Sequence, residues 1–264
     1  MKIGYDAKRA FANFTGLGNY ARSTISNICK VFPTHEFYLY TPKKVTDGAS
    51  DFIPDFKNAY IRGPRNLFYG TFSAAWRRFG IAADAAQDQI DLFHGLSHEI
   101  PDGIEKTNIK TVVTIHDLIF KRFPNYYKKI DRKIYDNKIK HAVKFAHKII
   151  AISEQTKKDI IEFYQVSENK IDVIYQACDI IFEKKHSNDE INFIKEKYML
   201  PQNYLLYVGT IEERKNALVI LQAMLQLPSH VKLVMVGKKK SYGITIDAFI
   251  KKHALNDRVF KSIK

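Results

Sequence analysis

The sequence predicts an α/β protein with a doubly wound parallel sheet, followed by the first part of a second unit of the same kind. Three observations predict this fold class. Short apolar runs rich in β-forming residues alternate with helical segments, a charged stretch at residues 183–190 interrupts the series once, and the alternation then resumes. We therefore expect two domains, residues 1–182 and 183–264.

Each strand of the first domain is expected at a short apolar run. These runs are residues 2–5, 36–41, 92–94, 111–116, 148–153 and 171–175. Helices are expected between them, at residues 19–31, 72–86, 131–146 and 154–164. The repeated order of strand and helix favours parallel pairing, with helices packed on both faces of the sheet.

The second domain repeats the pattern with fewer elements. Strands are expected at residues 204–208, 231–236 and 258–260, and helices at 189–198, 217–227 and 245–253. The run 204–208 is short and continuously apolar, as in a strand buried on both faces. Three strands are too few for a self-sufficient sheet of this type, so we expect the second domain to be incomplete.

Composition indicates a globular protein. Hydrophobic residues make up 45% of the 264 residues and aromatic residues 13%. No secretory signal is visible, and no apolar run approaches the roughly 20 residues needed to cross a bilayer. Cys29 and Cys178 lack the spacing of a zinc site or a disulfide framework, so both are expected to be reduced thiols. We expect a cytoplasmic protein.

A formal net charge of +14 favours a polyanionic partner, such as nucleic acid, an anionic membrane leaflet or a phosphorylated substrate. The densest basic run is residues 121–148, where apolar residues recur close to helical spacing. This segment is typical of a helix docked on its own domain with a solvated outer face, and it also fits membrane contact. Nucleic acid is not expected, because no nucleic-acid-binding motif is present.

The segment 204–216 has the pattern of an anion-binding site. The apolar strand ends at Gly209, and Arg214 and Lys215 then precede the helix expected at residues 217–227. The N-terminus of a helix favours an anion, and two adjacent cations strengthen the attraction. We expect Asn216 to cap this helix and the cations to bind a diphosphate.

Two glycines follow the first strand. Gly16 and Gly18 open the helix expected at residues 19–31, and such glycines let a backbone approach a ligand closely. The pattern is not the dinucleotide fingerprint, since Ala21 occupies the third glycine position, so NAD binding is disfavoured. A tight turn would look the same.

Polar residues follow two neighbouring strands. His116 and Asp117 come directly after the strand 111–116, and His94 ends the strand 92–94, with His98 and Glu99 close behind. Open α/β sheets bind ligands at this edge, although a structural histidine is also common there. A G-x-S-x-G elbow and a GxxxxGK[ST] loop are both missing, which argues against a serine hydrolase and a P-loop protein.

Several of these motifs, in this order, resemble one family. The matching segments are Asp6 and Ala7, residues 15–22, 93–95, 114–117, 151–154 and 207–216. They resemble the retaining, nucleotide-sugar-dependent glycosyltransferases of family 4, which include bacterial mannosyl- and glucosyltransferases with the GT-B fold. The resemblance runs from the first residue to about Val236.

The resemblance implies two Rossmann-like domains, the first binding mostly the acceptor and the second mostly the nucleotide-diphosphate sugar. It implies transfer of a mannose- or glucose-type hexose, with retention, to a glycan or lipid-linked acceptor, and no cofactor or obligatory metal. Catalytic roles fall to His116 at the donor sugar and to Arg214 and Lys215 at the diphosphate. Gly16, Gly18 and Gly209 are expected to border the phosphates, and His94 and Asp117 to contact substrate.

One expected motif of the family is missing. Its second domain continues with a late E-x7-E stretch, and nothing after Lys239 matches it. We therefore expect a C-terminally truncated member that is inactive as this chain. The protein is expected in the cytoplasm, in peripheral contact with the inner membrane face. The alternative is a non-enzymatic basic protein that binds nucleic acid or an anionic membrane surface.

Overall fold

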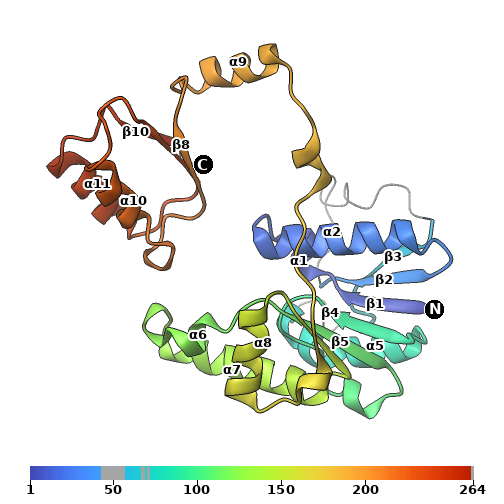
Figure 1. Cartoon of the computed structure of the whole chain (residues 1–264). Helices are drawn as coiled ribbons and strands as arrows, with labels where there is room; N and C mark the ends of the chain where they lie inside the picture. Colours follow the sequence, from blue (N-terminus) through green and yellow to red (C-terminus); the bar gives the residue numbers. More distant parts are fainter. Residues whose placement is uncertain (43–56, 67–68, 70–71, 263–264) are drawn as a thin grey trace. The chain divides into compact units, whose positions relative to one another are not determined.

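The computed structural model describes residues 1–42, 57–66, 69 and 72–262. It forms two compact units, Met1–Asp179 and Ile180–Lys264 (Figure 1). The first unit contains a seven-stranded parallel sheet with the order β3-β2-β1-β4-β5-β6-β7. Its strands are β1 Lys2–Asp6, β2 Glu36–Tyr40, β3 Ala59–Arg62, β4 Leu92–Gly95, β5 Lys110–Ile115, β6 Lys148–Ala151 and β7 Ile171–Val173.

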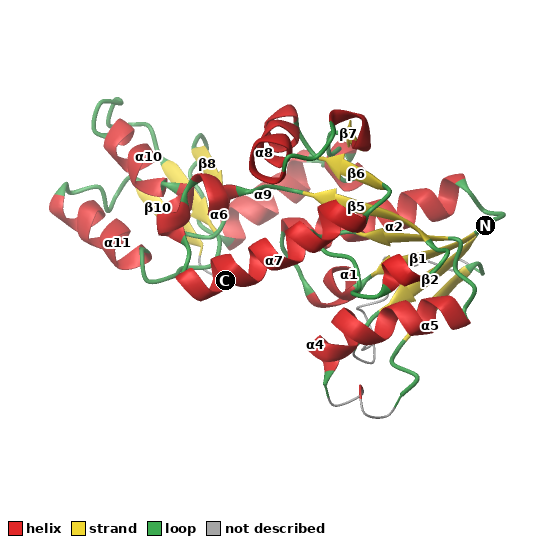
Figure 2. Ribbon diagram, turned by 90° about the horizontal axis from the view of Figure 1, so that it is seen from below, coloured by secondary structure: helices red, strands yellow, loops and turns green. Residues whose placement is uncertain are grey.

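Helices cover both faces of this sheet (Figure 2). They are α1 Lys8–Ala12, α2 Gly16–Val31, α4 Ser73–Ala75, α5 Ile81–Gln87, α6 Ile119–Arg122, α7 Lys129–Phe145 and α8 Glu154–Tyr164. A π-helical turn, Trp76–Gly80, joins α4 to α5. Short 3₁₀ turns occur at Ile104–Lys106, Pro124–Tyr126, Glu168–Lys170 and Ile180–Glu183.

The continuously apolar sequence of β2 is explained by burial of both faces of the strand. Phe37 and Leu39 belong to a buried cluster that also contains Ile25 of α2. Tyr38 and Tyr40, which point to the opposite face, belong to a second cluster with Trp76. Because both faces of the strand are buried, alternate polar residues would be costly, as predicted for a doubly wound parallel sheet.

The second unit contains a three-stranded parallel sheet with the order β10-β9-β8. Its elements are α9 Asn188–Lys197, β8 Leu205–Val208, a 3₁₀ turn Glu213–Lys215, α10 Ala217–Met224, β9 Leu233–Val236, α11 Gly243–Lys252 and β10 Val259–Ser262. Leu221 of α10, Met235 of β9 and Ile250 of α11 are among the residues of a third buried cluster. This cluster gives the second unit a core of its own.

The expected burial of residues 204–208 on both faces is wrong. Leu206 and Val208 are 58% and 71% exposed. Strand β8 is at the edge of the described sheet, and the core cluster lies on the face of Met235, opposite to Leu206 and Val208. The sequence analysis also did not foresee β3 and α1.

Two further expectations concern the cysteines and membrane-spanning helices. Cys29 and Cys178 are free thiols, as predicted. Among the described residues, no helix combines the length and the apolar character needed to span a bilayer.

Candidate functional site

The carboxyl ends of β4 and β5 bring two predicted site residues together. His94 is the second-last residue of β4, which pairs in register with β5, and His116 follows the end of β5. The His94 Nε2 atom lies 2.9 Å from Thr114 Oγ1, and the Tyr20 hydroxyl lies 3.0 Å from the same oxygen. The three side chains share one hydrogen-bonded group at the edge where α/β sheets bind ligands.

His116 is fixed in one orientation and one tautomer. Its Nε2 atom donates to the Leu96 carbonyl oxygen at 2.9 Å, so its Nδ1 atom accepts from the Gln176 amide at 3.0 Å. The edge of the Tyr20 ring packs against the imidazole, with ring centroids 4.7 Å apart. The sequence analysis did not identify Tyr20 or Gln176, since a contact across 60 residues or more leaves no local pattern.

These histidines are neutral at pH 7. Burial lowers the pKa of His94 to about 4 and that of His98 to about 3. Burial also lowers the pKa of His116, against the opposing effects of the Leu96 carbonyl and Asp117. The three imidazoles therefore act as hydrogen-bonding groups and not as cations.

Two buried nitrogens beside these rings have no partner. His98 Nδ1 and Arg9 Nε are enclosed without a hydrogen bond from the described residues. The His98 ring lies 5.2 Å from that of His116, and its backbone has a φ of 65°, in the left-handed region that non-glycine residues rarely adopt. Unpaired buried polar groups and backbone strain are both common at functional sites. His98 and Arg9 therefore join the candidate site.

Asp117 lines a cavity of about 570 Å³ next to His116. One Asp117 oxygen accepts from the Ile119 amide at 3.2 Å, which holds the carboxylate at the start of α6. The cavity wall also includes Phe123, a residue that is 55% exposed, and Gln155 of α8. An exposed ring beside hydroxyl, amide and carboxylate groups is suited to a sugar.

The structure corrects the expectation for Gly16 and Gly18. Helix α2 begins at Gly16, so both glycines lie in its first turn and not in a loop before it. A Cβ atom on Gly18 would lie 1.6 Å from the Asn13 carbonyl oxygen, whereas one on Gly16 would meet nothing within 4 Å. Gly18 is thus required by backbone packing, and only Gly16 borders open space.

The second unit places Arg214 and Lys215 in the turn directly before α10, as predicted. Two backbone bonds tie the start of this segment to the end of β9 and the residues that follow it. The Gly209 amide donates to the Val236 carbonyl, and the Ile211 amide donates to the Lys238 carbonyl, both at 2.9 Å. Gly237 fits closely here, because a Cβ atom would lie 2.1 Å from the Gly209 oxygen and its φ is +149°. The backbone that leads to Arg214 and Lys215 is therefore fixed against the end of β9.

Asn216 does not cap α10 as expected. It occupies the N-cap position with a φ of 47° and makes no side-chain capping bond. Arg214 donates to Glu212 at 2.7 Å, and Lys240 pairs with the same carboxylate. Although burial opposes it, these two cations hold the pKa of Glu212 below its usual value. Lys215 has no side-chain partner among the described residues and is available to a ligand.

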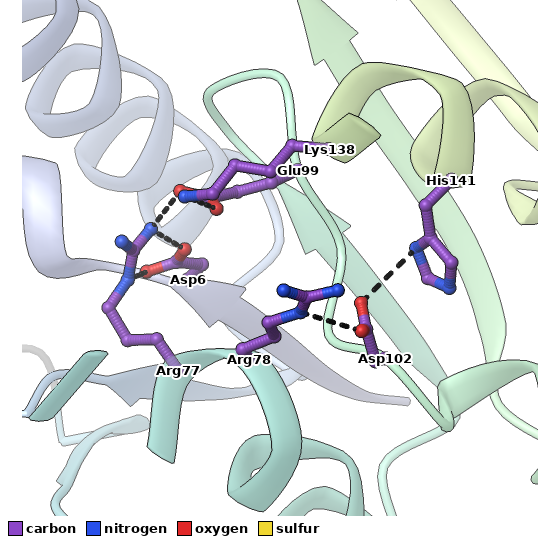
Figure 3. A network of polar contacts seen from close by, with 7 residues as sticks. All are labelled: Asp6, Arg77, Arg78, Glu99, Asp102, Lys138 and His141. Carbon is purple, nitrogen blue, oxygen red and sulfur yellow. Dashed lines mark hydrogen bonds and ion pairs between the residues drawn. The ribbon is translucent and has the colours of Figure 1, made fainter. Parts of the chain in front are cut away.

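A polar network missed by the sequence analysis includes Asp6, the last residue of β1 (Figure 3). Arg77, in the π-helical turn, is only 9% exposed and pairs with both Asp6 and Glu99, and Lys138 pairs with Glu99. Burial alone would raise the pKa of Glu99, but Arg77 and Lys138 lower it. The contacts join residues 22 to 71 positions apart, so no short motif reveals them.

The fold is that of a GT-B glycosyltransferase, as predicted. The chain belongs to Glycosyltransferase Family 4, whose family model matches residues 16–181. It is 27% identical over 250 residues to the O-antigen chain mannosyltransferase B of Escherichia coli, a match that covers 88% of this chain and 62% of that protein. It is 30% identical over 152 residues to the serotype-specific mannosyltransferase WbdA of Escherichia coli, covering 54% of this chain and 18% of that protein.

Solved structures agree in fold. The Anabaena Alr3699/HepE structure in complex with UDP and glucose has a TM-score of 0.67 at 16% identity, covering 98% of this chain and 68% of that one. WaaG, a glycosyltransferase involved in lipopolysaccharide biosynthesis, has a TM-score of 0.60 at 14% identity, covering 100% and 70%. The chain thus spans about 62% of the O-antigen mannosyltransferase's length.

Acid should destabilise the first unit before its carboxylates titrate. Between pH 6.5 and 4, His94 takes up a proton in the unfolded chain but stays neutral in the folded chain. The free energy of unfolding therefore decreases as the pH falls through this range. Above pH 6.5 His94 is neutral in both states, so stability no longer depends on its protonation. Each pKa unit corresponds to about 1.4 kcal/mol. Urea unfolding followed by fluorescence of Trp76, the single tryptophan, should show a flatter pH dependence for His94→Gln than for wild type. The exposed His230→Gln variant is the control, and parallel curves for all three proteins would contradict the expectation.

Proposed function

We propose that the chain binds a nucleotide-diphosphate sugar through its second unit, for transfer of a mannose- or glucose-type hexose with retention to a glycan or lipid-linked acceptor. The observation that carries this proposal is the placement of Arg214 and Lys215 directly before α10, on backbone tied to the end of β9. The bound UDP in the HepE structure and the mannosyltransferase relatives support a donor of this class.

The chemistry needs cations at this position. When the bond to the anomeric carbon breaks, negative charge grows on the leaving diphosphate, and fixed cations stabilise this transition state more than the ground state. Glu212 holds Arg214 in place, and Lys215, which no described side chain pairs with, adds a mobile charge. The leaving phosphate itself takes the acceptor proton in this proposal, so no carboxylate base is needed. Gly209 lets the backbone pass close to the phosphates.

The first unit supplies the acceptor side of the proposal. His116, which this proposal assigns to the donor sugar, is neutral and has both ring nitrogens bonded to Leu96 and Gln176, so it offers the sugar a fixed, uncharged ring for contact. Asp117 and the 570 Å³ cavity next to it provide room and partners for an acceptor sugar. His94 and Gly16 lie at the same edge of the sheet. In this proposal residues 1–182 bind the acceptor and residues 183–264 bind the donor.

Calorimetry with nucleoside diphosphates tests the donor site. We expect weak, salt-sensitive binding with little preference among UDP, GDP and ADP, since the diphosphate supplies the recognition. Arg214→Ala with Lys215→Ala should reduce the affinity at least about tenfold, which corresponds to about 1.4 kcal/mol. Lys251→Ala with Lys252→Ala, a neighbouring basic pair at the end of α11, should leave it unchanged. Equal affinities for both double variants would refute the assignment.

We also propose peripheral contact of α6 and α7 with an anionic membrane surface, at the inner membrane face. Four apolar residues of this region are strongly exposed: Phe123, Tyr126, Ile130 and Ile134 at 55%, 46%, 67% and 47%. Lysines and an arginine lie between them in the sequence, namely Lys128, Lys129, Arg132 and Lys133. Exposed apolar side chains with a basic rim are typical of an interfacial helix.

Cosedimentation separates membrane contact from the nucleic-acid alternative. The protein should pellet with vesicles that contain phosphatidylglycerol and should ignore short DNA duplexes at physiological salt. Reversing the charges of Lys128, Lys129, Arg132 and Lys133 should abolish vesicle binding. Tight duplex binding, lost in the same variant, would instead favour a nucleic-acid-binding protein.

A further inference from the structure

A second cavity lies between the carboxyl-terminal halves of α7 and α8. Its volume is about 510 Å³, and its wall contains four lysines and one acid: Lys121, Lys140, Lys144, Lys170 and Asp136. Helix α7 leads into β6 and α8 into β7, so these helix ends lie at the amino edge of the sheet. His116 lies at the carboxyl edge, and the proposed transfer reaction does not use this cavity.

The single acid is already satisfied inside the protein. Asp136 accepts from Lys121 at 2.6 Å and from the Tyr164 hydroxyl at 2.9 Å. Burial alone would raise the pKa of Asp136, but the two donors and the nearby Lys140 lower it, so Asp136 is charged and already paired with a cation. Four lysines and one carboxylate leave a formal excess of three positive charges in the cavity wall.

Of the four lysines in the cavity wall, Lys170 has a partner at a helix end. Lys170 donates to the Val143 and Lys144 carbonyl oxygens, at 2.8 and 2.9 Å, and so neutralises the carboxyl end of α7. An ammonium group has three donors, which leaves one N–H of Lys170 for a further partner. Lys140 and Lys144 lie one turn apart on α7, where like charges repel. Neither has an acidic partner within hydrogen-bonding distance among the described residues.

The rest of the wall is partly apolar and also contains Tyr164, Gln165 and Ser167. Val143, Val166 and Phe163 line the cavity beside the lysines. A concave, partly apolar wall strengthens the field of the cations, because less water screens it. It also provides a surface for an organic group attached to the anion.

We propose that this cavity is a binding site for a phosphate group that carries an apolar substituent. Lys140, Lys144 and the remaining N–H of Lys170 bind the phosphate oxygens, and Val143, Val166 and Phe163 contact the substituent. The ligand relieves the repulsion between Lys140 and Lys144. Both a soluble organic phosphate and the headgroup of a phospholipid have this chemistry.

A lysine footprint tests the site residue by residue. Acetylation of each lysine is measured by mass spectrometry with phenyl phosphate, with inorganic phosphate, and with vesicles of phosphatidic acid in phosphatidylcholine. With phenyl phosphate at about four times its Kd, modification of Lys140 and Lys144 should slow about fivefold, following 1 + [L]/Kd. Lys129 and Lys133, an equally spaced pair on the same helix, should not be protected by phenyl phosphate. Inorganic phosphate should protect Lys140 and Lys144 less than phenyl phosphate does.

A variant pair provides the second arm. With Lys140→Gln and Lys144→Gln together, phenyl phosphate should no longer raise the Tm. Lys129→Gln with Lys133→Gln should keep the response to phenyl phosphate. Protection by phosphatidic acid vesicles alone, still present in the Lys129/Lys133 variant, identifies the lipid as the source. Absence of protection at Lys140 and Lys144 with every probe, or an equal response of both variants, overturns the site.

Discussion

Replacing Arg77 with methionine should destabilise the first unit by about 3–5 kcal/mol, the cost of breaking a buried ion pair from one side. The guanidinium is 9% exposed and pairs with Asp6 and Glu99, which are 7% and 19% exposed. Methionine fills a similar volume but leaves Asp6 without its cation and Glu99 with Lys138 alone. The destabilisation follows from the remaining carboxylates and not from a cavity.

Urea unfolding followed by Trp76 fluorescence measures this effect in the first unit. The adjacent Arg78 provides a matched control, because its ion pair within the described part of the chain is with Asp102 alone and its side chain is 57% exposed. Arg78→Met should cost less than about 1 kcal/mol, as exposed pairs do. Similar midpoints for the two variants would show that the network of Arg77 contributes no more than a surface pair.

Replacing Gly18 with alanine should destabilise the same unit by about 3 kcal/mol or more, at the upper end of overpacking effects. The added Cβ atom would lie 1.6 Å from the Asn13 carbonyl oxygen and 3.0 Å from that of Arg9. Both obstacles are backbone atoms, so relief requires α1 and α2 to separate. Arg22 would then lose its bonds to the Ala10 and Asn13 oxygens, now 2.8 and 2.9 Å long.

Gly16→Ala is the control for this prediction. The position is in the same helical turn and has open space, so alanine should change stability by less than about 1 kcal/mol, toward stabilisation. Unfolding midpoints of the two variants, again from Trp76 fluorescence, give the comparison. If both alanine variants unfold alike, close packing at Gly18 is not the reason for the glycine.

The strands were predictable because the sheet is parallel and covered on both faces. Residues such as Phe37 and Phe93 are buried from opposite sides of the sheet, and this produces the short continuous apolar runs in the sequence. His94 and His116 were predictable as neighbours for a related reason. Parallel strands end at the same edge, so polar residues that follow two adjacent strands meet there.

Other features depend on contacts that leave no local pattern. Strand β3 lies at the edge of the sheet, where Ile61 is 42% exposed, and it lacks a continuous apolar run. The exposure of Val208 depends on which helices cover β8, and its sequence resembles that of a buried strand. Arg77 meets Asp6 across 71 residues. The conformation of Asn216 has the same origin, since the turn holding Arg214 is set by Glu212 and Lys240.

The separate cores of the two units have a consequence for how such a protein can evolve. Every buried cluster lies wholly within residues 1–179 or within residues 180–264, and residues 181–190 between them are exposed. A genetic crossover in this stretch would therefore divide no hydrophobic core. Related genes could exchange the half that carries Arg214 and Lys215 without repacking the half that carries His116, and each half would inherit its own stability. With the domain roles proposed above, new combinations of donor and acceptor would then arise by recombination, with few point mutations needed.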